Sequence, residues 1–115
     1  MKSLKLSGTV APEDLKGIVG SVSSEIENFI NYSLNGTDMT IVGAGKYFLR
    51  TNDRIGMYLI SASSSIEQRI DVSSVGGGGG LFNLSLGSKQ RYEEELVQAL
   101  ENFLKNNGII FETIE

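Results

Sequence analysis

INYSLNGTDMTIVGAGKYFLR, residues 30–50, carries the clearest fold signal in this chain. Apolar and polar side chains alternate from Ile30 to Leu34, which predicts a strand with one apolar face. The pair Asn35-Gly36 follows at once. It favours a two-residue type I′ turn, because that turn needs a positive φ angle at both positions. The stretch therefore predicts a β-hairpin.

Further strands extend this hairpin into an antiparallel meander. Gly43 and Gly45 favour a bulge or a sharp bend in the strand after the turn. Serine and polar turn residues separate the later segments. The expected strands after the turn are residues 39–50, 55–63, about 66–73, and LFNLSL at 81–86.

Two amphipathic helices flank the meander. The first begins at Pro12, which suits the first turn of a helix, and it ends somewhere between Ser24 and Phe29. The second is expected from Ser88, a suitable N-cap, to Asn106. Its apolar positions recur at helical spacing and predict a buried stripe. That stripe consists of Tyr92, Leu96, Ala99, Leu100, Phe103 and Leu104.

The order of elements predicts one α+β domain over residues 1–115. A first strand, LKLSGTV at residues 4–10, precedes the first helix, and IIFETI at the end is expected to form one more strand. We expect a curved antiparallel sheet in a small helix-grip-like arrangement, in the order β-α-β-β-β-β-β-α(-β). The two helices would cover one face, and the other face would meet water or a partner.

Composition removes several classes of function. The chain has 115 residues, a net charge of −4 and scattered basic residues, so it lacks the basic surface that nucleic-acid binding needs. It has no cysteine and no histidine, which excludes Ser-His-Asp and Cys-His catalysis and most transition-metal sites. No apolar run is long enough to cross a membrane. We therefore expect a cytoplasmic protein without a cofactor, and an enzymatic role is disfavoured.

Charged and aromatic residues have ordinary explanations. Glu67, Arg69 and Asp71 lie on one face of a predicted strand, and they predict a neutralised cross-strand charge pattern on a wet face. The four tyrosines are expected in the core or at its edge. They are Tyr32, Tyr47, Tyr58 and Tyr92.

The run VGGGGGLF, residues 75–82, leaves three alternatives open. The phosphate motifs fail by residue identity, and a predicted strand after the glycines offers no helix N-terminus to an anion. The run is then a mobile connection, an anion nest of backbone amides, or a site of close packing. If it binds a ligand, the candidate residues are Ser73, Ser74, Gly76, Gly77, Gly78, Gly79 and Gly80.

The segments LKLSGTV, INYSLNGTD and DVSSVGGGGGLF, with a final helix after them, resemble a family of small bacterial proteins, mostly from Firmicutes. That family is known only as a domain of unknown function. Its members have a serine-glycine stretch after a late strand, which Ser73, Ser74 and residues 76–80 match, although the polyglycine here is longer. The resemblance implies the helix-grip-like fold and no activity.

Three functional hypotheses follow. The first is a non-enzymatic binding module that presents an apolar surface to a small ligand or a protein partner. The second is an anion-binding protein or enzyme that uses the Gly76–Gly80 amides. The third is a structural homo-oligomer that pairs its strand edges.

Overall fold

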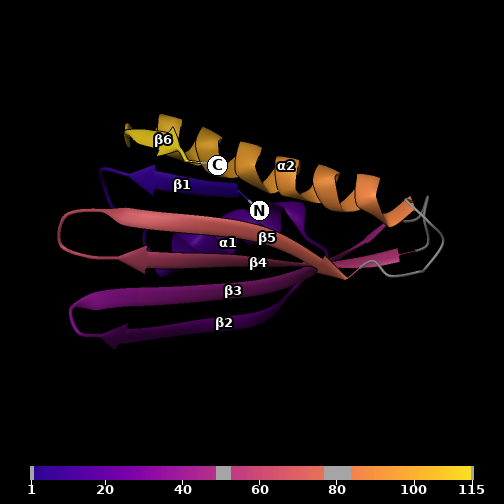
Figure 1. The fold of residues 1–115 in the computed structure, drawn as a ribbon, viewed down its shortest axis with the longest axis horizontal. Coiled ribbons are helices and arrows are strands. Elements are labelled where there is room, and N and C mark those ends of the chain that lie inside the picture. The colour runs from indigo at the N-terminus through magenta and orange to yellow at the C-terminus, as the bar shows by residue number, and fades with distance from the viewer. Residues whose placement is uncertain (1, 49–52, 77–83, 115) are drawn as a thin grey trace.

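The computed structural model describes residues 2–48, 53–76 and 84–114 (Figure 1). The elements follow the α+β order that the sequence predicts, with a run of strands between two helices. They are β1 (Lys2–Leu6), α1 (Pro12–Val22), β2 (Glu25–Leu34), β3 (Thr37–Phe48), β4 (Asp53–Ser63), β5 (Gln68–Gly76), α2 (Leu84–Asn106) and β6 (Phe111–Thr113).

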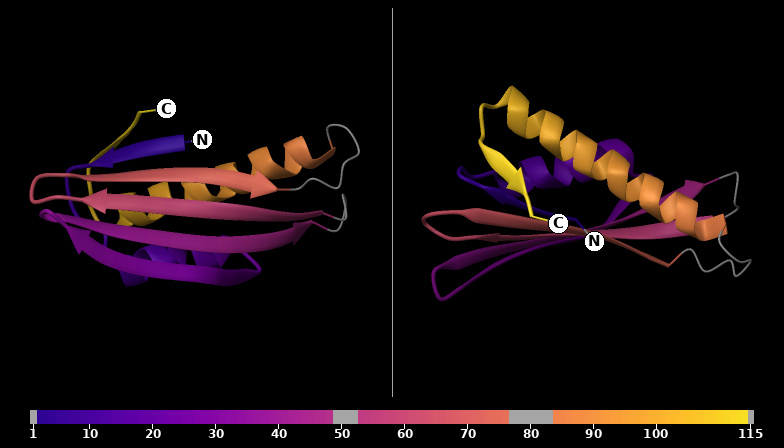
Figure 2. Two further views of the ribbon diagram at one scale, coloured as in Figure 1. Left: turned by 60° about the horizontal axis from the view of Figure 1, so that its bottom comes forward. Right: turned by 45° about the horizontal axis from the view of Figure 1, so that its top comes forward.

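The six strands form one antiparallel sheet in the order β2-β3-β4-β5-β1-β6. The meander β2–β5 ends beside β1, so the first strand lies between β5 and β6 (Figure 1). Both helices lie on the same side of the sheet (Figure 2). We call this side the inner face and the opposite side the open face. The predicted fold class, with two helices on one face, is confirmed.

The Asn35-Gly36 turn is confirmed. Asn35 has a φ angle of 52° and Gly36 one of 79°, and Leu34 pairs with Thr37 across the turn. Positive φ at both central residues gives the turn the same twist as the strands it joins. The turn therefore fixes which residues of β2 and β3 share a face.

The first helix ends earlier than predicted. α1 stops at Val22, and β2 has begun by Glu25. Ile26 and Phe29, which fit the helical spacing, lie in β2 and pack against the core from there. The backbone N–H of Ser24 donates to the Gly45 carbonyl at 2.8 Å, which brings the chain into the sheet at that point.

The second helix begins earlier than predicted. Residues 84–86, expected in a strand, are the first residues of α2, so Ser88 is inside the helix and is not its N-cap. Within the described residues, four strands and not five therefore separate the helices. The strand expected after the glycine run counted against anion binding at that run. This objection no longer holds, since a helix starts at Leu84. The expected last strand is confirmed as β6, which pairs with β1.

The predicted irregularity lies in the neighbouring strand. β3 pairs with β4 without interruption from Asp38 to Phe48, so Gly43 and Gly45 do not bulge. The register shift occurs in β2 between Ile26 and Asn28, opposite Ala44 and Gly43. The glycines have a different use, described below.

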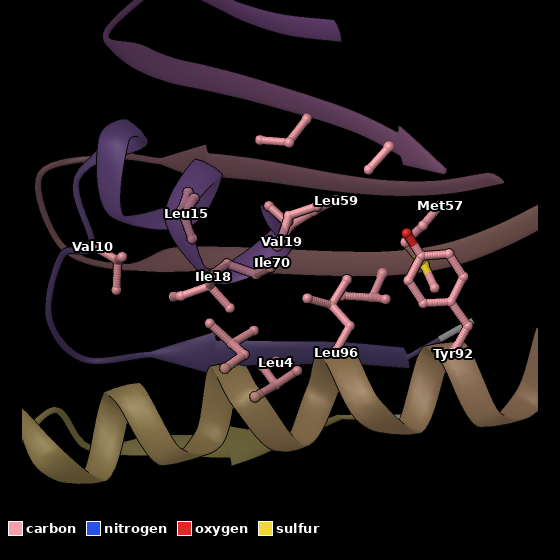
Figure 3. Packing of buried hydrophobic residues seen from close by; sticks show 14 of the residues in the cluster. Leu4, Val10, Leu15, Ile18, Val19, Met57, Leu59, Ile70, Tyr92 and Leu96 are labelled. Carbon is pink, nitrogen blue, oxygen red and sulfur yellow. The ribbon is translucent and has the colours of Figure 1, made fainter. Parts of the chain in front are cut away.

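The core lies between the inner face and the helices (Figure 3). Tyr92 and Leu96 of α2 point toward the strands (Figure 3) and belong to the same buried cluster as Met57 of β4. Tyr92 is fully buried, and its hydroxyl pairs with that of Ser23. Burial raises the pKa of the Tyr92 phenol, and the bond to Ser23 partly opposes this. The predicted stripe of α2 is therefore confirmed as a core surface.

Candidate functional site

The open face has no helix over it (Figure 2). Successive strand residues point to opposite faces, so the residues between the buried ones point to the open face. In β4, for example, Met57 and Leu59 are buried, whereas Tyr58 and Ile60 are exposed. Antiparallel sheets commonly have one solvated face, and such a face normally carries polar side chains. Half of this one does not.

An apolar patch covers β2, β3 and β4 on the open face. Ile30, Ile41 and Ile60 are cross-strand neighbours and form one row. Tyr32, Met39 and Ala62 form the adjacent row. Large exposed patches of this kind mark interaction surfaces more often than single exposed residues do. The apolar patch consists of Ile30 (48% exposed), Tyr32 (47%), Leu34 (62%), Tyr58 (40%) and Ile60 (38%), with the partly buried Met39 and Ile41 between them.

Gly43 lets the patch stay flat. A Cβ at this position would lie 3.0 Å from Cε1 of Tyr58 and 3.2 Å from Nδ2 of Asn28. The Tyr58 ring therefore lies across the backbone of β3, in the space that a side chain would fill. Gly56 allows a similar approach, since its Cβ would lie 3.0 Å from Cγ2 of Val75. Glycine here supplies close lateral packing on a smooth face.

A charged cluster lies at one end of the patch. The Arg54 guanidinium crosses Gly45, whose Cβ would lie 2.6 Å from the Arg54 Cζ. It donates to Glu27 and to Glu25, the latter at 2.5 Å. These hydrogen bonds, with Glu27 the larger contributor, raise the pKa of Arg54. Glu27 is the extra residue at the register shift of β2, so the shift serves to place its carboxylate.

The side of the open face over β5 and β1 is polar. Arg69 donates to Asp71 at 3.2 Å, Ser3 donates to the same carboxylate at 2.5 Å, and Lys5 lies 3.7 Å from Glu67. The predicted neutralised charge pattern is thus confirmed. Exposed pairs of this kind add little to stability. Because each pair joins a positive and a negative side chain, the β5–β1 side of the open face has no large excess of either charge.

The glycine-rich candidate site is only partly within the described residues. Ser73 pairs with Tyr58 and points to the open face, whereas Ser74 points to the inner face. Ser74 donates its backbone N–H at 3.1 Å and its hydroxyl at 2.5 Å to Glu93 of α2. Gly76 ends β5 opposite Ile55. Gly77, Gly78, Gly79 and Gly80, and with them the expected mobility of the run, lie outside the described residues.

All four tyrosines were expected in the core or at its edge, and this is confirmed for one of them. Tyr92 is in the core, but Tyr32, Tyr47 and Tyr58 are exposed. The alternation of side chains along the strand could have indicated that Tyr58 is exposed, because its neighbours Met57 and Leu59 point to the opposite face and are buried. Choosing the buried face needed the positions of the helices.

Among the described residues, no group of three or more acidic residues is arranged to hold a metal ion. No described helix has both the length and the apolar character that crossing a membrane requires.

Comparisons with known proteins point to a family without an assigned role. Residues 14–106 match the model described as "Family of unknown function (DUF6054)". Searches of curated proteins and of solved structures find no match.

Proposed function

The chain belongs to the DUF6054 family, whose description assigns no function, and we propose that it is a non-enzymatic protein-interaction module. The observation that carries the proposal is the apolar patch on the open face. Its tyrosines fit this role, because aromatic residues are enriched where protein surfaces meet. The absence of histidine and cysteine from the sequence fits a role in binding better than one in catalysis.

The partner we propose is a second copy of this chain, packed face to face. In a two-fold interface the same surface meets itself, so an apolar patch is automatically complementary to its copy. The area suffices. The molecule measures 45 × 26 × 21 Å, and the strands spread over the two longer dimensions in Figure 1, which gives a face on the order of 1,000 Å². A standard interface buries about 800 Å² on each partner.

The charged borders permit this packing. Arg54 offsets one of the two negative charges of Glu25 and Glu27, and the Arg69–Asp71 pair is neutral. Each copy therefore carries little uncompensated charge at these borders, so charge repulsion opposes association only weakly. Two sheets that pack in this way lie about 10 Å apart, with the side chains of the patch filling the space between them.

Sedimentation equilibrium with a charged substitution tests the proposal. Ile60→Lys places a cation in the central row of the patch, whereas Ile66→Lys places one in the β4–β5 turn, where Ile66 is 81% exposed. We expect a dimer for the wild type and for Ile66→Lys, and a monomer for Ile60→Lys with unchanged circular dichroism. A wild-type monomer, or a dimer that survives Ile60→Lys, would contradict the proposal.

A further inference from the structure

The side chains of the inner face change from apolar to polar toward the end of the sheet that carries the β2–β3 and β4–β5 turns. One cross-strand row consists of Phe29, Val42 and Leu59 and belongs to the core. Both rows beyond it are polar where they cross β2, β3 and β4, and the first continues to the buried Ile70 in β5. The first contains Asn31, Thr40 and Ser61, and the second contains Ser33, Asp38, Ser63 and Gln68.

These two rows form the floor of a pocket of about 280 Å³. The loop between β1 and α1 supplies its wall, through Thr9, Val10 and Pro12. The volume is close to the lower end of the range for small-molecule sites, about 300 Å³. Thr40 and Ser61 are buried in the floor at 4% and 1% exposure. Burying hydroxyls where a core row could continue is costly unless each finds a partner.

Gln68 fixes the wall of this pocket. Its Oε1 accepts from the Val10 N–H at 2.7 Å, and its Nε2 donates to the Val10 carbonyl at 3.3 Å and to Ser61 Oγ at 2.7 Å. The side chain is 1% exposed. It is a positioning residue, because it holds the loop against the floor while its own polar atoms are fully used.

Other polar groups of the pocket retain bonding capacity. Asn31 Oδ1 accepts from the Thr40 hydroxyl at 2.9 Å, while the Asn31 amide nitrogen has no acceptor among the described residues. Asp38 accepts the Ser33 hydroxyl at 2.5 Å through Oδ1, and a carboxylate has further lone pairs to offer. The pocket thus presents both donors and acceptors to an occupant.

The charge of the lining narrows the class of ligand. Among the described residues, Asp38 is the one charged residue that lines the pocket, and none of the described lysines and arginines does so. An anion would meet an unopposed carboxylate. An ammonium ion only donates, so it would leave the Asn31 amide unmatched. A hydroxyl group donates and accepts, and several of them on a small ring or chain would satisfy both residues at once.

We propose that this pocket binds a small neutral polyhydroxylated molecule of the monosaccharide class. Asp38 would accept from one or two of its hydroxyls, and Asn31 would donate to another. The inference does not rest on the open face, which is the other side of the sheet.

Amide NMR titration tests the proposal, with D-glucose, D-ribose and myo-inositol as probes and putrescine and inorganic phosphate as comparisons. We expect saturable shifts for Asn31, Asp38 and Ser63 with at least one polyol. Asp38→Asn and Asn31→Ala should each weaken that binding about tenfold. Ser63→Ala should weaken it as well, whereas the matched control Ser21→Ala, on α1 and outside the pocket lining, should leave it unchanged.

Three results would overturn the proposal. They are no saturable shift with any of the polyols, a response to putrescine or phosphate alone, and polyol shifts that persist unchanged in both Asp38→Asn and Asn31→Ala. The folded state of each variant is checked from its own amide spectrum. A loss of dimer in the preceding experiment would leave these outcomes unaffected.

Discussion

Replacing Gln68 with leucine should destabilise the protein by about 2–4 kcal/mol. The substitution keeps the approximate volume but leaves the Val10 N–H and the Ser61 hydroxyl without their partner, and both residues are buried, at 3% and 1% exposure. Each buried polar group that loses its partner costs about 1–3 kcal/mol. The added apolar contact of leucine offsets part of the sum. The remainder is a large share of the about 5–15 kcal/mol that stabilises an ordinary domain.

Urea unfolding followed by circular dichroism measures this loss as a lower midpoint at an unchanged slope. Gln90→Leu is the matched control, because Gln90 is exposed on α2 and its replacement should change stability by less than about 0.5 kcal/mol. A double-mutant cycle sharpens the test. Once Ser61→Ala has removed the orphaned hydroxyl, Gln68→Leu should cost about 1 kcal/mol less than it does alone.

A loss below about 1 kcal/mol for Gln68→Leu would refute the reasoning, since two buried unsatisfied groups cannot cost so little. If the stability losses of Gln68→Leu and Ser61→Ala add up to that of the double variant, the hydrogen bond between Gln68 and Ser61 is refuted. Either result would also remove the support for the wall of the polar pocket.

Three further predictions concern the turn, the core and the alkaline range. Gly36→Val should cost more than about 1 kcal/mol in urea unfolding, because a β-branched residue tolerates the φ angle of 79° poorly; a neutral midpoint would contradict this. Leu100→Ala should cost about 2–5 kcal/mol, since Leu100 is fully buried, and a loss below about 1 kcal/mol would place it outside the core. Tyr92 has a raised pKa in the folded state. Its contribution to folding stability is therefore complete below the ordinary tyrosine pKa of about 10, and it is lost as the pH rises through the pKa of the folded state. Tyr92→Phe should therefore unfold less steeply with pH in alkaline titrations, and an unchanged alkaline limb would contradict the assignment.

The parts of the fold that follow from local chemistry were predictable from the sequence. Asn35-Gly36 sets its turn by backbone conformation alone, and the position of β2 against β3 follows from it. The charges at Arg69 and Asp71 likewise alternate with the apolar residues Ile70 and Val72, which are buried. In such cases the local structure is determined by residues that are close together in the sequence.

The parts that depend on distant contacts were not predictable. Three alternating residues, 84–86, fit a short strand as well as the first turn of a helix, and periodicity cannot decide between them at that length. Tyr58 and Ile60 alternate with Met57 and Leu59, and both sets are apolar. Only the placement of α1 and α2 decides which set is buried. The apolar patch and the two polar rows of the pocket thus emerge only when the strands are assembled.

An isotope-filtered NOE experiment tests face-to-face association most directly. Equal amounts of carbon-13-labelled and unlabelled protein are mixed, and only contacts between different copies are recorded. We predict intermolecular contacts from the Ile60 methyl groups and from the rings of Tyr32 and Tyr58, all on the open face. Intermolecular contacts confined to the free edge of β2, or none from the apolar patch, would contradict the proposed docking surface.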